Sequence, residues 1–349
     1  MVTADRSDLA RRFRIQARSC ENLGSPLYAH LLTNAAADIE TGGPVWKVMR
    51  EHASRPRGSA RALRLMGAVH RRVLEGKAPE LAPFYPTVGG DATGAGAWDA
   101  FLGFVERTTD DLRSLAGRPV QTNEVGRSGA LVGGFLEVAR TTGLPLRVLE
   151  LGSSAGLNLR WDHFLYEARG VTWGDKSSPV RLCDFNSERP PPFDVTARVQ
   201  ERRGCDPHPV DPLSDEGART LIAYVWPDQT RRIRLLRAAI EVARRVPSTV
   251  DEEDAAQWLG RQLAEPAGGV ATVVFHSIVL QYMSEETRAG VDEVMSRWAE
   301  RATREAPLAR LEMEPGGDHA NVHLTMWPGA EKRLVATAGY HGAHVRWLL

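Results

Sequence analysis

The chain has 349 residues, and its 44 Lys and Arg balance 44 Asp and Glu, so the formal net charge at pH 7 is zero. This balance gives no reason to expect a nucleic acid as partner. Hydrophobic residues at 42% and charged residues at 25% are typical of a globular protein with one or two domains. There is no run of the ~18 apolar residues that a membrane span needs, no apolar signal-peptide core, and no CxxC pair among Cys20, Cys183 and Cys205. These absences predict a cytoplasmic protein without a disulfide framework.

In residues 1–120, apolar residues recur at helical spacing between Gly and Pro breaks, which predicts a helical N-terminal domain. This domain is expected to cap the substrate. The expected helices cover Leu9–Ala17, the residues after Ser25-Pro26, Val45–His52, Ala60–Leu74 and Trp98–Leu115. The segment Pro83–Gly96 is rich in turn residues, and loops of this length are usually either flexible or functional. Tyr85 and Asp91 are its candidate lid residues, Tyr85 as a catalytic group and Asp91 as a substrate contact.

A helix start is expected in TNEVGRSG, shortly before the strongest motif of the chain. Four hydrogen-bonding side chains gather there, namely Asn123, Glu124, Arg127 and Ser128. One interpretation is an ordinary capped helix, with Ser128 or Asn123 as the cap. In the other interpretation the polar helix start borders a pocket, which makes Asn123, Glu124 and Arg127 candidate substrate-binding residues.

The stretch LRVLELGSSAGLNL combines a buried strand, an acidic residue and a glycine turn. Glycines let the backbone turn sharply and approach a ligand, as in nucleotide-binding βαβ units. A phosphate P-loop is excluded because Leu157 and not Lys follows Gly156, and a GxGxxG dinucleotide motif would need a third glycine. The remaining form, (E/D)xGxxxG, predicts an S-adenosylmethionine site. Its candidate residues are Glu150, Gly152, Ser153, Ser154, Gly156 and Asn158.

Two further carboxylates are expected to complete this cofactor site. Asp206 ends the next predicted core strand and would bind the ribose hydroxyls, while Asp254 would receive the adenine amine. Asp206 lies far beyond the ~20 residues usual for a βαβ unit, so residues near 160–196 must form an inserted hairpin. Asp175 and Asp184 compete for these roles, and each aspartate has the alternative of a cap or turn residue.

The rest of the chain alternates strands and helices. Gly268–Ser277 is a continuous β-branched strand, a helix follows from Ser284, and LARLEMEP, ANVHLTMWP and KRLVATAGYHGAHVRWL predict three more strands. The predicted fold class is α/β, with a doubly wound, mostly parallel sheet of the class I methyltransferase-like Rossmann type over residues 121–349. The last two strands are expected to form an antiparallel C-terminal hairpin.

Candidate catalytic groups follow the fourth predicted core strand, in HSIVLQY. Methyl transfer to nitrogen or oxygen needs a positioned nucleophile and often a base. His276 is the candidate base, Tyr282 a second catalytic candidate and Gln281 a substrate contact. The alternative for His276 is a core histidine at the end of a buried strand.

A second candidate group is YVWPDQ, with Trp226 as a substrate contact and Asp228 as a catalytic residue. The alternative for Asp228 is a helix cap. His319 and His323 fall in or beside an expected strand, and no metal site is predicted from them.

Several motifs of the chain resemble, in the same order, those of a bacterial family catalogued as domain of unknown function 2332. They are TNEVGRS, LELGSSAGLNL, RRGCD, YVWPDQ, VVFHSIVLQY and WPG...HGAHVRW. The chain resembles this family over nearly its whole length, which implies a methyltransferase-like fold with a helical N-terminal portion. The expected function is an S-adenosylmethionine-dependent methyltransferase, or methyltransferase-like enzyme, acting on a small polar metabolite. Two alternatives stay open: an enzyme of this fold that catalyses intramolecular displacement, cyclisation or elimination, and a non-catalytic partner subunit. The expected partners are a small-molecule substrate and either a protein partner or a second copy in a homodimer.

Overall fold

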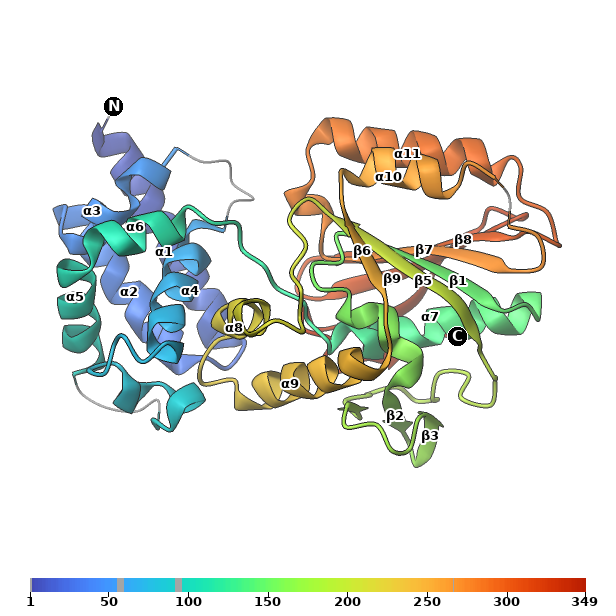
Figure 1. Ribbon diagram of the computed structural model, residues 1–349, viewed down its shortest axis with the longest axis horizontal. Coiled ribbons are helices and arrows are strands. Elements are labelled where there is room, and N and C mark those ends of the chain that lie inside the picture. Colours follow the sequence, from blue (N-terminus) through green and yellow to red (C-terminus); the bar gives the residue numbers. More distant parts are fainter. Residues whose placement is uncertain (1, 55–59, 92–95, 266) are drawn as a thin grey trace. The chain divides into compact units, whose positions relative to one another are not determined.

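The computed structural model describes residues 2–54, 60–91, 96–265 and 267–349, and Figure 1 labels most of their elements. The chain divides into two compact units, Met1–Thr122 with Ser214–Arg234, and Asn123–Leu213 with Leu235–Leu349. The first division falls close to the predicted boundary at residue 120. The sequence places Ser214–Arg234 in the α/β part, but α8 (Asp215–Ala223) contacts α4 (Arg61–Leu74) and Trp226 joins the same core. This segment therefore belongs to the helical unit.

The second unit is an α/β domain built on an eight-stranded, mostly parallel sheet (Figure 1). Parallel strands lie in the order β6-β5-β1-β7-β8, and β9, β10 and β11 extend the sheet antiparallel. The strands are β1 (Leu146–Leu151), β5 (Val199–Asp206), β6 (Thr249–Glu252), β7 (Ala271–Ser277), β8 (Leu308–Pro315), β9 (Ala320–Trp327), β10 (Lys332–Ala338) and β11 (Arg346–Trp347). The C-terminal edge thus has more antiparallel pairings than the predicted hairpin. The strand order reverses between β1 and β7, where open α/β sheets bind ligands at their carboxyl edge.

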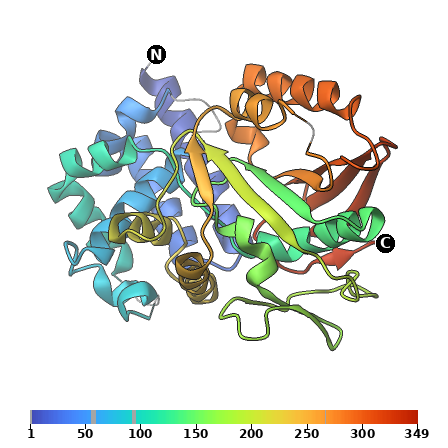
Figure 2. The same ribbon diagram turned by 45° about the vertical axis from the view of Figure 1, so that its right-hand side comes forward.

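Helices cover both faces of this sheet (Figure 2). They are α7 (Arg127–Thr142), α9 (Thr230–Arg245), which is divided between the units, α10 (Ala255–Gln262) and α11 (Glu285–Ala299). On one face, α10 and α11 pack on a cluster that includes Val274. On the other face, Phe135 of α7 meets Phe275 edge to face, with ring centroids 5.1 Å apart. Because side chains alternate along a strand, these contacts identify the face to which each neighbouring side chain points.

The connection between β1 and β5 differs from the expected helix over Leu157–Tyr166. Leu157–His163 forms a short 3-10 segment, η5, which leaves helical geometry at Arg160 and ends at an extended Phe164. A small sheet of order β3-β2-β4 follows, formed by β2 (Leu165–Ala168), β3 (Val171–Gly174) and β4 (Arg181–Leu182). Strands β2 and β3 are antiparallel, so this region contains a hairpin where the sequence predicts one.

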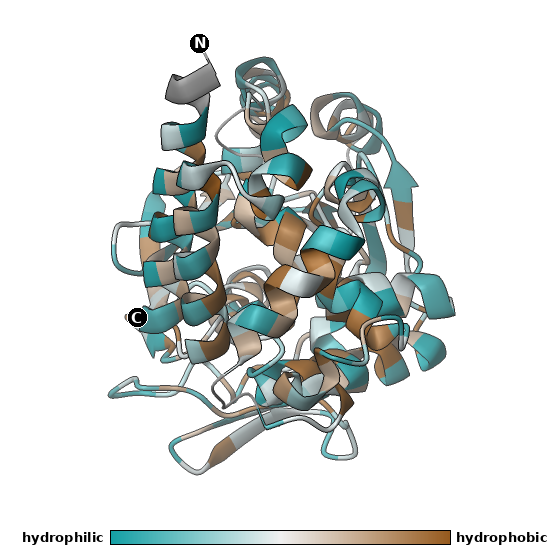
Figure 3. Ribbon diagram, turned by 90° about the vertical axis from the view of Figure 1, so that its left-hand side faces the viewer, coloured by the Kyte–Doolittle hydropathy of each residue, from teal (hydrophilic) through white to brown (hydrophobic). Residues whose placement is uncertain are grey.

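The first unit consists of helices whose apolar sides meet in one core. Its elements are α1 (Val2–Asn22), α2 (Pro26–Thr41), α3 (Pro44–Met49), η1 (Arg50–His52), α4, η3 (Ala82–Phe84), η4 (Pro86–Val88), α5 (Ala97–Arg107), α6 (Thr109–Ala116) and α8. Figure 3 shows hydrophobic residues on the inner sides of these helices and hydrophilic residues outside. The helix expected over Trp98–Leu115 is divided at Thr108, where φ is −118°. Of the predicted loop Pro83–Gly96, residues 92–95 lie outside the described residues. No helix in the described part of the chain is long and apolar enough to span a membrane.

Candidate functional site

The glycine turn leads from β1 into η5 and has an unusual backbone. The φ angles of Gly152, Ser154 and Gly156 are 66°, 53° and 65°, a conformation that suits glycine and strains serine. A Cβ atom on Gly152 would clash with a methyl group of Val279, so this position needs glycine for space as well. The main-chain N–H of Ser154 donates to the Asp206 carboxylate at 3.0 Å, which holds the strained residue in place.

Glu150 is the buried acid of this site. Its side chain is 2% exposed, and Oε2 has no hydrogen-bond partner among the described residues. Burial raises the pKa of the Glu150 carboxyl well above its usual range, Asp206 adds to this, and Arg160 and Arg127 oppose it. A buried carboxylate with too few donors is costly, so this position favours a cationic ligand group that would stabilise the ionised form.

The start of α7 lies against the glycine turn. Asn123 Oδ1 accepts the N–H of Leu157 at 2.8 Å, and the Ser128 hydroxyl donates to Asn158 Oδ1 at 2.8 Å. Asn158 Nδ2 donates to the carbonyl of Glu124 at 3.3 Å. The structure therefore brings the predicted residues of the α7 start and of the turn together, and their contacts fix the turn on α7.

Asp206 lies at the end of β5, directly beside β1. Its carboxylate oxygens accept the main-chain N–H groups of Ser154, at 3.0 Å, and His208, at 2.9 Å. Val210 then donates its N–H to the Ser154 carbonyl at 3.1 Å, so the chain after β5 folds over the turn. A carboxylate can accept about four hydrogen bonds, so this structural role does not exclude hydroxyl donors.

Asp254, the second predicted cofactor-binding carboxylate, has a structural role at the start of α10. Its carboxylate accepts the N–H of Ala256 at 2.9 Å and the hydroxyl of Thr287 at 2.7 Å. It caps α10 and links that helix to α11, because an aspartate before a helix satisfies the otherwise unpaired N–H groups of the first turn. The two competing aspartates also contact other residues of the chain. Asp175 accepts from the Ser177 N–H at 2.8 Å, and Asp184 lies 3.2 Å from His344.

His276 is fully buried, on the sheet face opposite Glu150. Glu150 is paired with Phe275, so the next residue points to the α10 and α11 side. His276 Nδ1 lies 2.7 Å from Glu314 Oε1, and Nε2 lies 3.6 Å from Glu312 Oε1. Burial lowers the pKa of His276, but the two carboxylates outweigh it and raise the pKa overall. This geometry is that of the core histidine alternative, and not of a base that substrate can reach.

The loop after β7, Ile278–Met283, carries exposed side chains at the carboxyl edge of the sheet. Tyr282 is 53% exposed, and Gln281 is exposed as well. Arg127, at the start of α7, donates to the Ser277 carbonyl at 2.9 Å, so α7 reaches the end of β7. Arg127, Gln281 and Tyr282 therefore come from segments that meet at the end of β7.

Four predicted residues lie in the helical unit: Tyr85, Asp91, Trp226 and Asp228. Asp91 is exposed, but Tyr85 and Trp226 are buried in the core, which does not suit Tyr85 to a lid. Asp228 accepts the hydroxyl of Ser25 at 2.6 Å and the N–H of Leu27 at 3.0 Å. It is therefore a cap, as the alternative interpretation states, but it caps α2 and not the helix that follows it.

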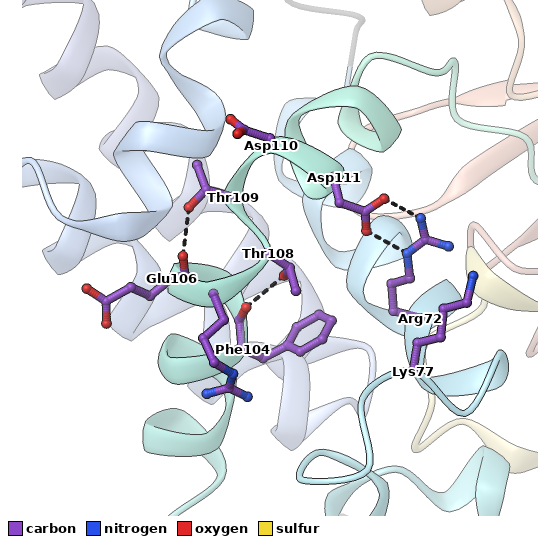
Figure 4. A pocket seen from close by; sticks show the side chains of 9 residues that line it. Arg72, Lys77, Phe104, Glu106, Thr108, Thr109, Asp110 and Asp111 are labelled. Carbon is purple, nitrogen blue, oxygen red and sulfur yellow. Dashed lines mark hydrogen bonds and ion pairs between the residues drawn. The ribbon is translucent and has the colours of Figure 1, made fainter.

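A hollow of about 490 Å³ opens beside the α5 and α6 junction of the helical unit (Figure 4). Several of its charged side chains contact other residues: Arg72 donates to Asp111 at 2.6 Å, and Asp110 accepts from Arg113 at 2.7 Å. The hollow therefore has no evident ligand preference. Within the described ranges, no three His, Cys, Asp or Glu side chains are grouped to hold a metal ion.

Residues that sequence analysis did not select also shape the site. Arg160 is buried and donates to the carbonyls of Gly156 and Val246, both at 2.7 Å, close enough to affect Glu150. Arg160 lies in an apolar run, and nothing in the sequence there indicates a role in the site. Glu312 and Glu314 could have been recognised from the sequence, because two carboxylates at alternate positions of a buried strand share one face and need partners there.

Comparisons with known proteins give one match. No curated protein and no solved structure matches the chain. A family model matches residues 10–347, which is nearly the whole sequence, including both units. The chain therefore belongs to the family described as "Uncharacterized protein conserved in bacteria (DUF2332)".

Proposed function

We propose that this protein is a cytoplasmic S-adenosylmethionine-dependent methyltransferase with a class I Rossmann-like core, acting on a small polar metabolite. Two features of the α/β unit support this. The parallel strands follow the order β6-β5-β1-β7-β8, with a glycine turn directly after β1. The observation that carries the proposal is the buried Glu150 carboxylate at this edge, whose Oε2 has no partner in the described part of the chain.

The residues at the turn fit the polar groups of this cofactor. Glu150 would accept from the ammonium of the methionine part, and Asp206 from the ribose hydroxyls. When bound, the cofactor supplies an electrophilic methyl group to a nitrogen or oxygen of the acceptor. Gln281 and Tyr282 would contact that acceptor. Val279 lies against Gly152, so binding requires the loop after β7 to move.

Isothermal titration calorimetry with S-adenosylmethionine and its demethylated product tests the proposal. Saturable binding is expected, and Glu150→Gln should weaken it about 10- to 100-fold, because a charge-assisted hydrogen bond is lost. Asp254→Ala is the control, since it removes a partly buried carboxylate that caps α10 and bonds Thr287 of α11, and it should leave the affinity unchanged. No binding of either compound at high micromolar concentration would refute the proposal. Mass spectrometry of any molecule released on denaturation would then identify a different ligand.

A further inference from the structure

The segment after β7, which we call the 278–283 loop, covers the glycine turn. The side chain of Val279 lies so close to Gly152 that even a methyl group on that glycine would clash with it. Val279 therefore fills the space beside the turn where, in open α/β sheets, a ligand approaches the backbone. In this conformation the loop and a ligand would compete for the same space.

Two hydrogen bonds attach the start of this loop to β8. The N–H of Ile278 donates to the Met313 carbonyl at 2.8 Å, and the N–H of Val279 donates to Glu314 Oε1 at 3.0 Å. The same Glu314 oxygen lies 2.7 Å from Nδ1 of the fully buried His276. One carboxylate thus connects the loop, through Val279, to a histidine in the sheet.

The backbone of this loop is strained where it leaves β7. Ile278 has a φ angle of 52°, which a β-branched residue adopts at an energetic cost. Such a conformation persists only where surrounding contacts hold it. The two hydrogen bonds to β8 are among the contacts that hold this segment, so weakening one of them favours departure of the loop from the turn.

Glu314 differs in its partners from Glu312, the neighbouring carboxylate on the same face of β8. Glu312 contacts the ammonium of Lys332 at 2.9 Å and the guanidinium of Arg310 at 3.2 Å. Glu314 has one oxygen, Oε2, without a hydrogen-bond partner among the described residues. A buried carboxylate oxygen without a partner is costly to keep, which indicates that the contacts of Glu314 with His276 and Val279 have a specific use.

We propose that Glu314 is a positioning residue that holds the 278–283 loop over the glycine turn, and that release of this loop admits the ligand beside Gly152. The second half rests on the proposed function, because it requires a ligand at the turn. The first half concerns the protein alone and can be measured without any ligand.

Hydrogen exchange of the unliganded protein tests the first half. Glu314→Gln keeps the shape of the side chain but removes its charge, and should accelerate exchange of the Val279 amide about 10-fold, since charge-assisted hydrogen bonds are roughly twice as strong as neutral ones. Glu312→Gln is the matched control, which removes the other carboxylate near His276 and should leave that amide unchanged. If Glu314→Gln does not fold, Glu314→Asp, which withdraws the carboxylate by one methylene, should accelerate exchange in the same direction. Equal exchange in wild type and the folded Glu314 variant overturns the proposal.

Stopped-flow measurement of S-adenosylmethionine association tests the second half. Glu314→Gln should raise the association rate constant several-fold, and Glu312→Gln should not. Faster exchange with an unchanged association rate constant would show that the loop does not control access. If the wild type binds no S-adenosylmethionine, the proposed function fails together with this access role, whereas the exchange result still decides whether Glu314 holds the loop.

Discussion

Glu150 and Phe275 are paired across the neighbouring parallel strands β1 and β7, which places His276, the next residue, on the opposite face of the sheet. Glu150 therefore lies on the side of α7 and the glycine turn, and His276 on the side of α10 and α11. The sequence analysis assigns both residues to one active site, but the sheet separates their side chains. His276 is better understood as part of a buried ionic cluster with Glu312 and Glu314.

Replacement of His276 should destabilise the protein in a pH-dependent way. The pKa of His276 is raised above its ordinary value of 6.5, so its pairing is fully present below pH 6.5 and is lost as pH rises through the raised pKa. Glu312 has a pKa lowered from 4.5 to about 2, so its contribution is present above pH 4.5 and lost toward pH 2. His276→Gln should therefore lower the free energy of unfolding most between pH 4.5 and 6.5, by about 1.5–3 kcal/mol, because the partly buried Glu314 loses a charged partner while Glu312 keeps Lys332 and Arg310.

Urea unfolding of wild type and His276→Gln across this pH range measures the difference. The penalty should shrink as the pH rises beyond the raised pKa of His276. A penalty of the same size at every pH would show that the imidazole is neutral throughout and that only its packing matters.

The strands and the glycine turn could be predicted from the sequence because their signals are local: a buried run, closely spaced glycines, a cap before a helix. The face on which His276 points could not, because it depends on the register between β1 and β7. A shift of one residue moves a side chain to the other face. The contact of Asp206 with Ser154 depends likewise on β5 pairing beside β1.

The role of Asp228 could not be predicted for a different reason. Its partner Ser25 is 203 positions away in sequence, so the pattern WPDQ indicates a cap but not which helix is capped. Asp254, by contrast, caps the helix that directly follows it, and its sequence pattern contains all of that information. Local caps can be recognised in a sequence, whereas caps supplied from a distant segment need the fold.

Asp228→Ala should lower stability without affecting a ligand at the glycine turn. The carboxylate satisfies the N–H of Leu27 in the first turn of α2, and loss of such a cap costs about 0.5–2 kcal/mol. Ser25→Ala removes only the hydroxyl donor to Asp228 and should cost less. Thermal unfolding measures both variants. A loss of enzymatic activity at unchanged stability would instead restore Asp228 as a catalytic residue.

Binding of a cationic ligand at Glu150 should release a proton. Burial raises the pKa of this carboxyl well above its usual range, which favours the protonated form of Glu150 in the free protein. A cation beside Oε2 favours the ionised form, and the displaced proton goes to the buffer. Apparent affinity should then fall as the pH drops below the pKa of Glu150 in the free protein, by at most about tenfold per pH unit for one linked proton.

Calorimetric titrations in two buffers of different ionisation enthalpy measure this proton directly, because the observed heat contains the heat of buffer protonation. Wild type should show a buffer-dependent heat, and Glu150→Gln, which has no proton to lose, should not. The same heat in both buffers for the wild type would mean that Glu150 is already ionised before binding or does not meet the cation. In the first case Glu150→Gln still weakens binding, and in the second it leaves the affinity unchanged, so the variant separates the two explanations.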